Sequence, residues 1–154
     1  MGELLTKPVC ERLLAESVED VLETMFFTCR AEELPEDAGA DPGPVVEIRF
    51  RGNPPGVFHQ RLGRRAAAEL AASFLGAASP EEVTQAELEN VLRELANVIC
   101  GRALSRIESD STFALSSPEI LAEAAPVTEN CSAHCLIPLE TGQIEVWLAL
   151  EAPR

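Results

Sequence analysis

The stretch ELANVICG, residues Glu94–Gly101, lies inside a long predicted central helix and sets the main constraint on the fold. It contains a carboxylate, Glu94, and a carboxamide, Asn97, three residues apart in an otherwise apolar run. Because an α-helix has about 3.6 residues per turn, the two side chains leave the helix on the same face. A core helix has no packing use for this pair, whereas a helix that presses an acid and an amide into a partner's active site does.

The predicted central helix extends over about 84–107 and has two faces. At about 100° per residue, the large apolar side chains gather on one side, and a narrow stripe of polar and small residues forms on another. The apolar side consists of Leu88, Val91, Leu92, Leu95, Val98 and Ile99. The second set, which we call the polar stripe, consists of Glu87, Asn90, Glu94, Asn97 and Gly101.

The polar stripe costs the helix stability. Asparagine is a poor helix former, and Gly101 costs about 1 kcal/mol relative to alanine. A small residue at that position would let another backbone come close. A solvated helix face is the ordinary interpretation of a Glu-x-x-Asn pattern taken alone, so the neighbouring motifs have to decide between the two.

The segments around the central helix carry clear periodicities. Helical spacing predicts a first helix over about 8–29 and a second over about 64–75, which Gly76 would end. Alternation of apolar and polar residues predicts strands over 46–51 and 57–62. The segment of about 32–44, rich in acids, proline and glycine, is expected to be a flexible loop. Ser79 and Pro80 resemble a helix start.

The C-terminal part of the chain reads as extended. We expect a short strand over 113–116 and a hairpin of strands over 131–139 and 143–151. The last strand would be an edge strand able to pair across a dimer. Trp147 lies on the face opposite Ile144 and Val146, where a helix or a second subunit would cover it. The order of elements predicts a single α+β domain over 1–154, an antiparallel sheet with long helices packed on one face.

Composition limits the possible partners. The 154 residues carry a net charge of -14, which argues against nucleic acid, because phosphate binding needs lysine and arginine. No apolar run approaches the roughly 18 residues of a membrane span. The N-terminus lacks the basic start and long apolar run of a signal peptide, so a cytoplasmic protein that binds no membrane is expected.

The five cysteines suggest reduced thiols rather than a disulfide framework. The one cluster with metal-binding residue types is Cys131, His134 and Cys135. In a strand, Cys131 and Cys135 share a face about 13 Å apart and His134 points the other way. Because zinc needs thiolates at about 2.3 Å, buried thiols are the better interpretation and no metal site is expected.

The ordered set of motifs resembles the CheX members of the CheC/CheX family of chemotaxis phosphatases. The resemblance covers about 6–151. Its main motif is Glu94-Leu95-Ala96-Asn97 followed by Gly101. Before this motif come Phe50-Arg51-Gly52, Gly56-Val57 and the helix 66–76, and after it comes Phe113–Pro118. The first helix has no second Glu-x-x-Asn, which favours the one-site CheX type over the two-site CheC type. The segment 119–125 lacks the glycine expected after the Ser-Pro turn, and the loop of 32–44 is longer and more acidic than usual.

The resemblance implies an enzyme that hydrolyses the aspartyl phosphate of a phosphorylated CheY-type response regulator. The regulator would supply the phosphoryl group, Mg²⁺ and a lysine, so this chain would bind no cofactor of its own. Asn97 would orient the attacking water, as a catalytic glutamine does in some GTPases. Glu94 would pair with the regulator's lysine, and a homodimer is implied.

Two interpretations of the polar stripe stay open. In the first, the protein is the phosphatase just described, Glu87 and Asn90 are rim contacts or a solvated face, and Gly101 leaves room for the partner. In the second, it is a non-catalytic binding or adaptor domain of a two-component pathway, in which the acidic face only holds a partner.

Overall fold

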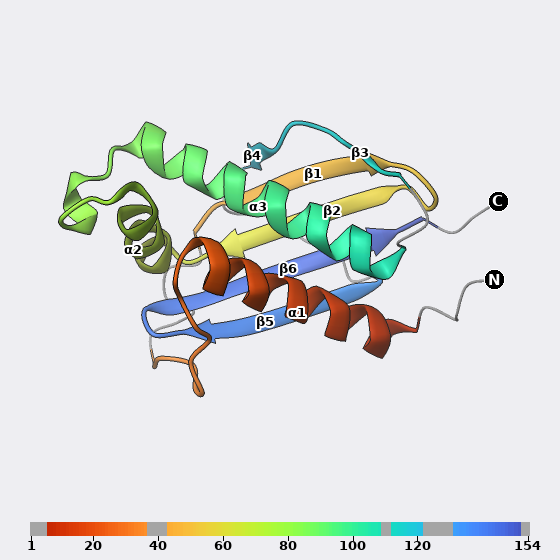
Figure 1. Ribbon diagram of the computed structural model, residues 1–154, viewed down its shortest axis with the longest axis horizontal. Coiled ribbons are helices and arrows are strands. Elements are labelled where there is room, and N and C mark those ends of the chain that lie inside the picture. The colour runs from red at the N-terminus through yellow and green to blue at the C-terminus, as the bar shows by residue number, and fades with distance from the viewer. Residues whose placement is uncertain (1–5, 37–42, 109–111, 122–130, 152–154) are drawn as a thin grey trace.

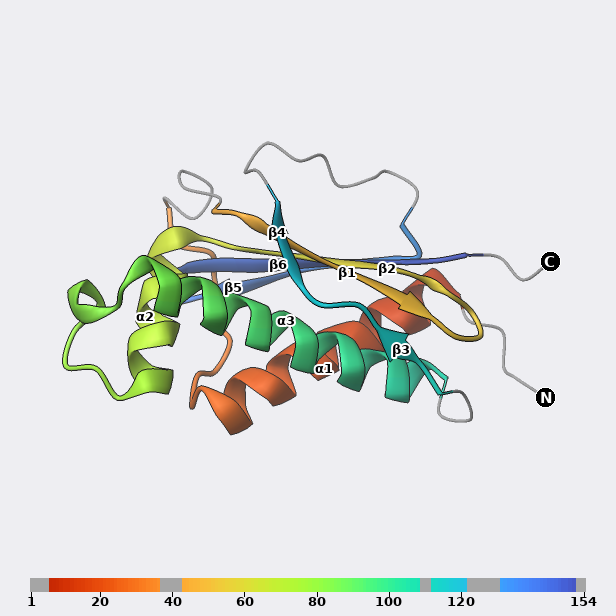
Figure 2. The ribbon, with the colours of Figure 1, turned by 90° about the horizontal axis from the view of Figure 1, so that it is seen from above.

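The protein forms one antiparallel sheet with its helices packed on one face (Figures 1 and 2). The structure, a computed structural model, describes residues 6–36, 43–108, 112–121 and 131–151. The sheet has six strands in the order β3-β1-β2-β6-β5, and β4 also pairs with β1. The strands are β1 (Val45–Arg51), β2 (Gly56–Leu62), β3 (Ala114–Leu115), β4 (Glu119–Leu121), β5 (Ala133–Leu139) and β6 (Gly142–Leu150).

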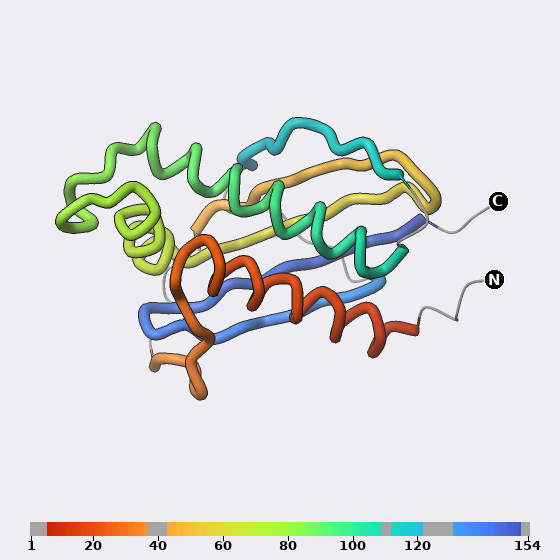
Figure 3. Tube along the Cα trace, in the orientation of Figure 1, coloured from red at the N-terminus to blue at the C-terminus, as the bar shows by residue number. Residues whose placement is uncertain are grey.

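The α-helices are α1 (Lys7–Met25), α2 (Arg64–Leu75) and α3 (Gln85–Ile107). Helices α1 and α3 run antiparallel beside each other over the sheet, and α2 lies near the start of α3 (Figures 1 and 3). In the described ranges, none of the helices has the length and apolar character needed to cross a membrane. The predicted α+β architecture, an antiparallel sheet with long helices on one face, is confirmed.

The core lies between the helices and the inner face of the sheet. Helix α3 buries every third or fourth residue, and strands β2 and β6 bury alternate residues, as their sequence periods predict. Fully buried large side chains come from α1, α3, β1 and β2 and include Leu14, Leu22, Ile48, Phe58, Leu92, Leu95, Ile99 and Leu104. Each such side chain stabilises the fold by about 1.5–3 kcal/mol relative to exposure.

A capping box fixes the start of α3. The hydroxyl of Thr84 accepts a hydrogen bond from the backbone N–H of Glu87 at 3.1 Å, and the Glu87 carboxylate accepts one from the N–H of Thr84 at 2.9 Å. The helix start expected at Ser79 and Pro80 is that of a separate short 3₁₀ helix, Pro80–Glu82, after which Val83 is extended. The central helix therefore begins where Thr84 can cap it.

Helix α3 is also held from two sides along its length. The Asp20 carboxylate of α1 forms ion pairs with Arg102 and, at 3.3 Å, with Arg106. From the sheet, the fully buried Gln60 donates from Nε2 to the carbonyl of Leu92 at 3.4 Å. These contacts fix both the rotation and the position of the helix over the sheet.

One helix boundary and one strand differ from the sequence-based predictions, and two segments can be compared only in part. The first helix ends at Met25 instead of near residue 29, because Phe27 adopts a positive φ of 54° and turns the chain. The strand β4 was not predicted, because three residues are too few to show a period. The expected loop of 32–44 and the segment 119–125 are described only in part, since 37–42 and 122–130 lie outside the described residues.

The prediction that the last strand is an edge strand is wrong. Strand β6 pairs with β2 on one side and β5 on the other, so β5 is the edge strand at that end of the sheet. Local sequence could not show this, because strand order depends on which distant segment joins the sheet.

Trp147 is largely buried within a single chain. It is 9% exposed and, by alternation along β6, lies on the face opposite Val146 and Leu148, which belong to the core under the helices. The His134 ring stacks on it with centroids 5.2 Å apart, and the Arg61 guanidinium lies 5.8 Å from the ring centroid. His134 is held by Glu145 at 2.8 Å. The cover thus comes from neighbouring strands.

Of the two clustered thiols that the sequence predicted to be buried, Cys135 is buried but Cys131, before the start of β5, is partly exposed; Cys100 of α3 is buried as well. Cys135 Sγ donates to the carbonyl of Glu11 at 3.1 Å, and the neighbouring His134 faces the other side of the sheet. Burial raises the pKa of Cys100 to about 12, and burial together with the Glu11 carboxylate raises the pKa of Cys135 to about 11. Both groups therefore stay protonated at neutral pH.

The buried face of α3 predicts a large stability effect for Leu95→Ala. Leu95 is 0% exposed, so its truncation should lower the free energy of unfolding by about 2–5 kcal/mol through lost burial and a cavity. Asn97→Ala, two residues away on the exposed side, should change it by less than about 0.7 kcal/mol. Urea unfolding followed by circular dichroism measures both; equal effects would contradict the two-faced helix.

The thiol environments predict selective labelling. The thiolate is the reactive form, so a pKa of about 12 leaves roughly one Cys100 in ten thousand reactive at pH 8. An aromatic disulfide reagent should label the exposed Cys29 quickly and Cys100 only after unfolding in guanidinium. Cys29→Ser should remove the fast phase and leave a slower one from the partly exposed Cys131. Rapid labelling of Cys100 in the folded protein, seen by peptide mapping, would contradict its burial.

Candidate functional site

The polar stripe of α3 faces outward over its whole length. Glu87, Asn90, Glu94 and Asn97 are exposed and Gly101 is partly exposed. On the other side of the same helix the fully or nearly fully buried residues are Val91, Leu92, Leu95, Ala96, Ile99 and Cys100. Leu88 and Val98, which the sequence assigns to the apolar side, lie at its border and are partly buried.

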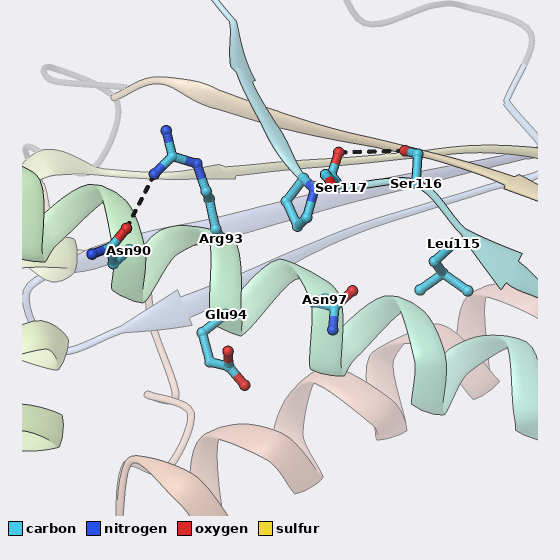
Figure 4. A pocket seen from close by; sticks show the side chains of 8 residues that line it. Asn90, Arg93, Glu94, Asn97, Leu115, Ser116 and Ser117 are labelled. Atoms are coloured by element: carbon cyan, nitrogen blue, oxygen red, sulfur yellow. Dashed lines mark hydrogen bonds between the residues drawn. The ribbon is translucent and has the colours of Figure 1, made fainter.

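A hollow of about 490 Å³ lies between this stripe and the segment that joins β3 to β4 (Figure 4). We call it the loop hollow. It is lined by Asn90, Arg93, Glu94, Asn97, Leu115, Ser116, Ser117 and Pro118. The fold thus brings a helix face and a distant turn together around one open space.

The turn that forms the second wall is fixed on β1. The backbone N–H of Ser116 donates to the carbonyl of Arg49 at 2.7 Å, and the Ser116 hydroxyl accepts from the N–H of Arg49 at 2.9 Å. Strand β4 then pairs with β1 again through Glu119 and Glu47. The turn is therefore anchored at both ends, and its wall has a defined position relative to α3.

The side chains of Glu94 and Asn97 are available to a partner. Within the described ranges, neither makes a hydrogen bond or an ion pair, and they lie one helical turn apart along α3 (Figure 4). The outer pair is already in use: Asn90 accepts from Arg93 at 3.2 Å, and Glu87 belongs to the capping box. Of these two pairs, only the inner one has both side chains without a hydrogen-bond partner in the described ranges.

Gly101 is not required by packing inside the chain. A Cβ added at this position would meet nothing within 4 Å. Because glycine weakens a helix that gains nothing from it, the free space is in keeping with an approach by another molecule. That role stays a prediction.

Sequence reasoning missed Arg93 and the wall of Ser116–Pro118 as parts of this site. Arg93 lies at the edge of the loop hollow and also pairs with Glu89 at 3.8 Å. Only the Ser-Pro turn carried a signal, as one of the motifs of the resemblance. Its place opposite α3 depends on the pairing of β3 and β4 with β1, which no local pattern reveals.

The side chains of this site are suited to positioning other groups by hydrogen bonds and charge. A carboxamide offers a donor and an acceptor, and an ionised carboxylate offers acceptors only. Together, Asn97 and Glu94 can hold a water and a cation of a partner at a fixed spacing on a rigid helix. These two groups could act on a reaction whose other components arrive with the partner.

Comparison with known proteins identifies the family of this chain. The model of the family described as chemotaxis phosphatase CheX matches residues 45–139. No curated protein matches the sequence significantly. Among solved structures, the chemotaxis protein CheX of Desulfovibrio desulfuricans is similar over 92% of this chain and 99% of its own, with a TM-score of 0.71 and 16% identity.

Two further structures share the fold. CheX of Vibrio vulnificus matches 97% of this chain and 100% of its own, with a TM-score of 0.68 and 17% identity. The CheX of a CheX–CheY–BeF₃–Mg²⁺ complex from Borrelia burgdorferi matches 92% of this chain and 97% of its own, with a TM-score of 0.67 and 17% identity. The family match spans more than half of the sequence and contains both walls of the loop hollow. The protein therefore belongs to the chemotaxis phosphatase CheX family.

Proposed function

We propose that this protein hydrolyses the aspartyl phosphate of a CheY-type response regulator by inserting α3 into the regulator's active site. The observation that carries the proposal is the free and exposed pair Glu94 and Asn97 on a helix held at its start and along its length. The structure of a CheX–CheY–BeF₃–Mg²⁺ complex from Borrelia burgdorferi, which shares this fold, supports the choice of partner.

The proposed reaction is an in-line displacement. The oxygen of a water attacks the phosphorus while the bond from phosphorus to the aspartyl oxygen breaks, which releases inorganic phosphate and the regulator's carboxylate. Phosphoryl transfer depends mainly on positioning and electrostatics. The Asn97 carboxamide accepts a hydrogen bond from the water and holds its lone pair toward phosphorus. Mg²⁺ belongs to the regulator and neutralises charge on the phosphoryl oxygens.

Glu94 docks the helix in this proposal. Its carboxylate, one turn before Asn97, pairs with the regulator's active-site lysine. An exposed ion pair contributes little, but a pair desolvated at an interface costs several kcal/mol when one partner is removed. Glu94 therefore sets the depth to which α3 enters the regulator's active site, and this depth places Asn97 next to the attacking water.

The remaining stripe residues act at the rim. Asn90 and Glu87 lie toward the N-terminal end of α3, where they reach the regulator's surface, and Gly101 lets its backbone approach. Glu87 also caps the helix, so its replacement would affect stability as well as binding. We further propose a homodimer; β5 replaces β6 as the edge strand at that end of the sheet, although the carbonyl of Pro138 and the N–H of His134 on it already bond to Ala31 and Glu11.

Asn97→Ala is expected to abolish most of the activity while the fold survives. Loss of the group that orients the water should lower kcat about a hundredfold or more. The measurement is the decay of a phosphorylated CheY-type regulator from the same source, in magnesium, with and without each protein. Full activity of Asn97→Ala would disprove the assignment. No acceleration by wild type, together with retained binding, would favour the adaptor interpretation.

Glu94→Lys is expected to abolish binding, because it places a cation against the regulator's lysine. The Kd for the beryllofluoride-loaded regulator should rise at least about thirtyfold by calorimetry. Glu23→Lys makes the same change of charge at an exposed position of α1 outside the stripe and serves as the control. Equal losses in both variants would show that only net charge matters, and that Glu94 has no specific role.

A further inference from the structure

A second hollow lies beside the polar stripe, between α3 and the last turn of α2. It has a volume of about 260 Å³, and we call it the apolar hollow. It is lined by Phe74, Leu75, Glu87, Asn90, Val91 and Glu94. Asn90 and Glu94 also line the loop hollow, so the two hollows are neighbours along α3.

Two apolar side chains form one wall of this hollow although water can reach them. Phe74 is 40% exposed and Leu75 is 44% exposed. In the described part of the chain, the other large apolar residues with comparable exposure are Phe27, Leu34 and Leu136, and none of these lines either hollow. An exposed apolar pair next to a functional helix marks an interaction site more often than a scattered single residue does.

The wall is held in place by the fold. The Phe74 ring stacks on the fully buried Phe26 of the α1 end, with centroids 5.0 Å apart. Gly76, with a left-handed φ of 71°, ends α2 directly after Leu75. The floor is Val91, which is 5% exposed and belongs to the core side of α3. The apolar hollow is therefore preformed, and filling it requires little ordering of this chain.

The edge of the apolar hollow is negatively charged and favours a positively charged group on the partner. Glu87 and Glu94 place two carboxylates at the edge of an apolar space. Such a site fits an apolar side chain that has a basic residue next to it on the partner. A volume of this order is ample for one large aliphatic or aromatic side chain, since an apolar cavity of about 150 Å³ holds benzene.

We propose that the apolar hollow receives an apolar side chain of the CheY-type regulator, one that lies beside the regulator's active-site lysine. This inference rests on the proposed function for the identity of the partner, and it goes further by separating affinity from chemistry. The α3 pair performs the reaction, and the Phe74–Leu75 wall supplies binding energy that is equal in the ground state and the transition state. Such uniform binding changes KM and leaves kcat unchanged.

Leu75→Ser tests the proposal. Leu75 is exposed and does not belong to the core cluster, so the fold should persist in the variant, as circular dichroism can verify. KM for the phosphorylated regulator should rise about tenfold at constant kcat, because burying the exposed half of a leucine contributes about that factor. Leu34→Ser is the matched control: Leu34 is 46% exposed, lines neither hollow, and should leave KM unchanged.

Binding of the beryllofluoride-loaded regulator separates this proposal from the catalytic one. If wild type binds the regulator without accelerating its dephosphorylation, only the catalytic role is disproved. In that case a tenfold higher Kd for Leu75→Ser still supports the apolar hollow as a docking site. An unchanged KM and Kd for Leu75→Ser would overturn the hollow as a docking site. A changed sedimentation coefficient in Leu75→Ser alone would assign the hollow to a second copy and likewise overturn it. Absence of any binding by wild type would remove both proposals.

Discussion

The burial of one side of α3 is the interaction on which the rest of the structure depends. Leu95 and Ile99 are fully buried against the sheet and α1, while Glu94 and Asn97 are exposed within the same turns. The helix cannot rotate to hide the polar pair without exposing apolar side chains that stabilise the fold by about 1.5–3 kcal/mol each. The position of the candidate catalytic groups is thus set by packing, and a helix with asparagine and glycine on its outer face is maintained despite their poor propensity.

The same helix is fixed along its axis by polar contacts of different kinds. Thr84 and Glu87 define its first turn, Gln60 holds the carbonyl of Leu92 from the sheet, and the ion pairs of Asp20 restrain its last turns. A positioning role in phosphoryl transfer requires this restraint, because a misplacement of about 1 Å can cost about a hundredfold in rate. The polar contacts hold the backbone of α3 in place, and the side chains of Glu94 and Asn97 on it stay free to bind a partner.

The sequence predicted the elements whose residues repeat at a regular period. Helices α2 and α3, strands β1 and β2 and the β5–β6 hairpin follow from their apolar spacing, and Glu94 with Asn97 follows from the spacing of the acid and the amide. The features that were missed or misplaced depend on contacts between distant segments. Among these are the central position of β6, the short strand β4, the wall of Ser116–Pro118 and the hollow beneath Leu75. The early end of α1 at Met25 was missed because Phe27, neither glycine nor asparagine, takes the left-handed conformation there.

Trp147 has a consequence for optical measurements on this protein. It is the sole tryptophan of the chain, and it contacts His134 and Arg61 on the sheet face opposite the core. Its fluorescence therefore reports on the far side of the sheet, with the core between the indole and the polar stripe. If a regulator without tryptophan binds at α3 and changes this emission, binding on one side of the sheet alters the surroundings of Trp147 on the other side. If the emission stays the same, the far side of the sheet keeps its structure when the regulator binds.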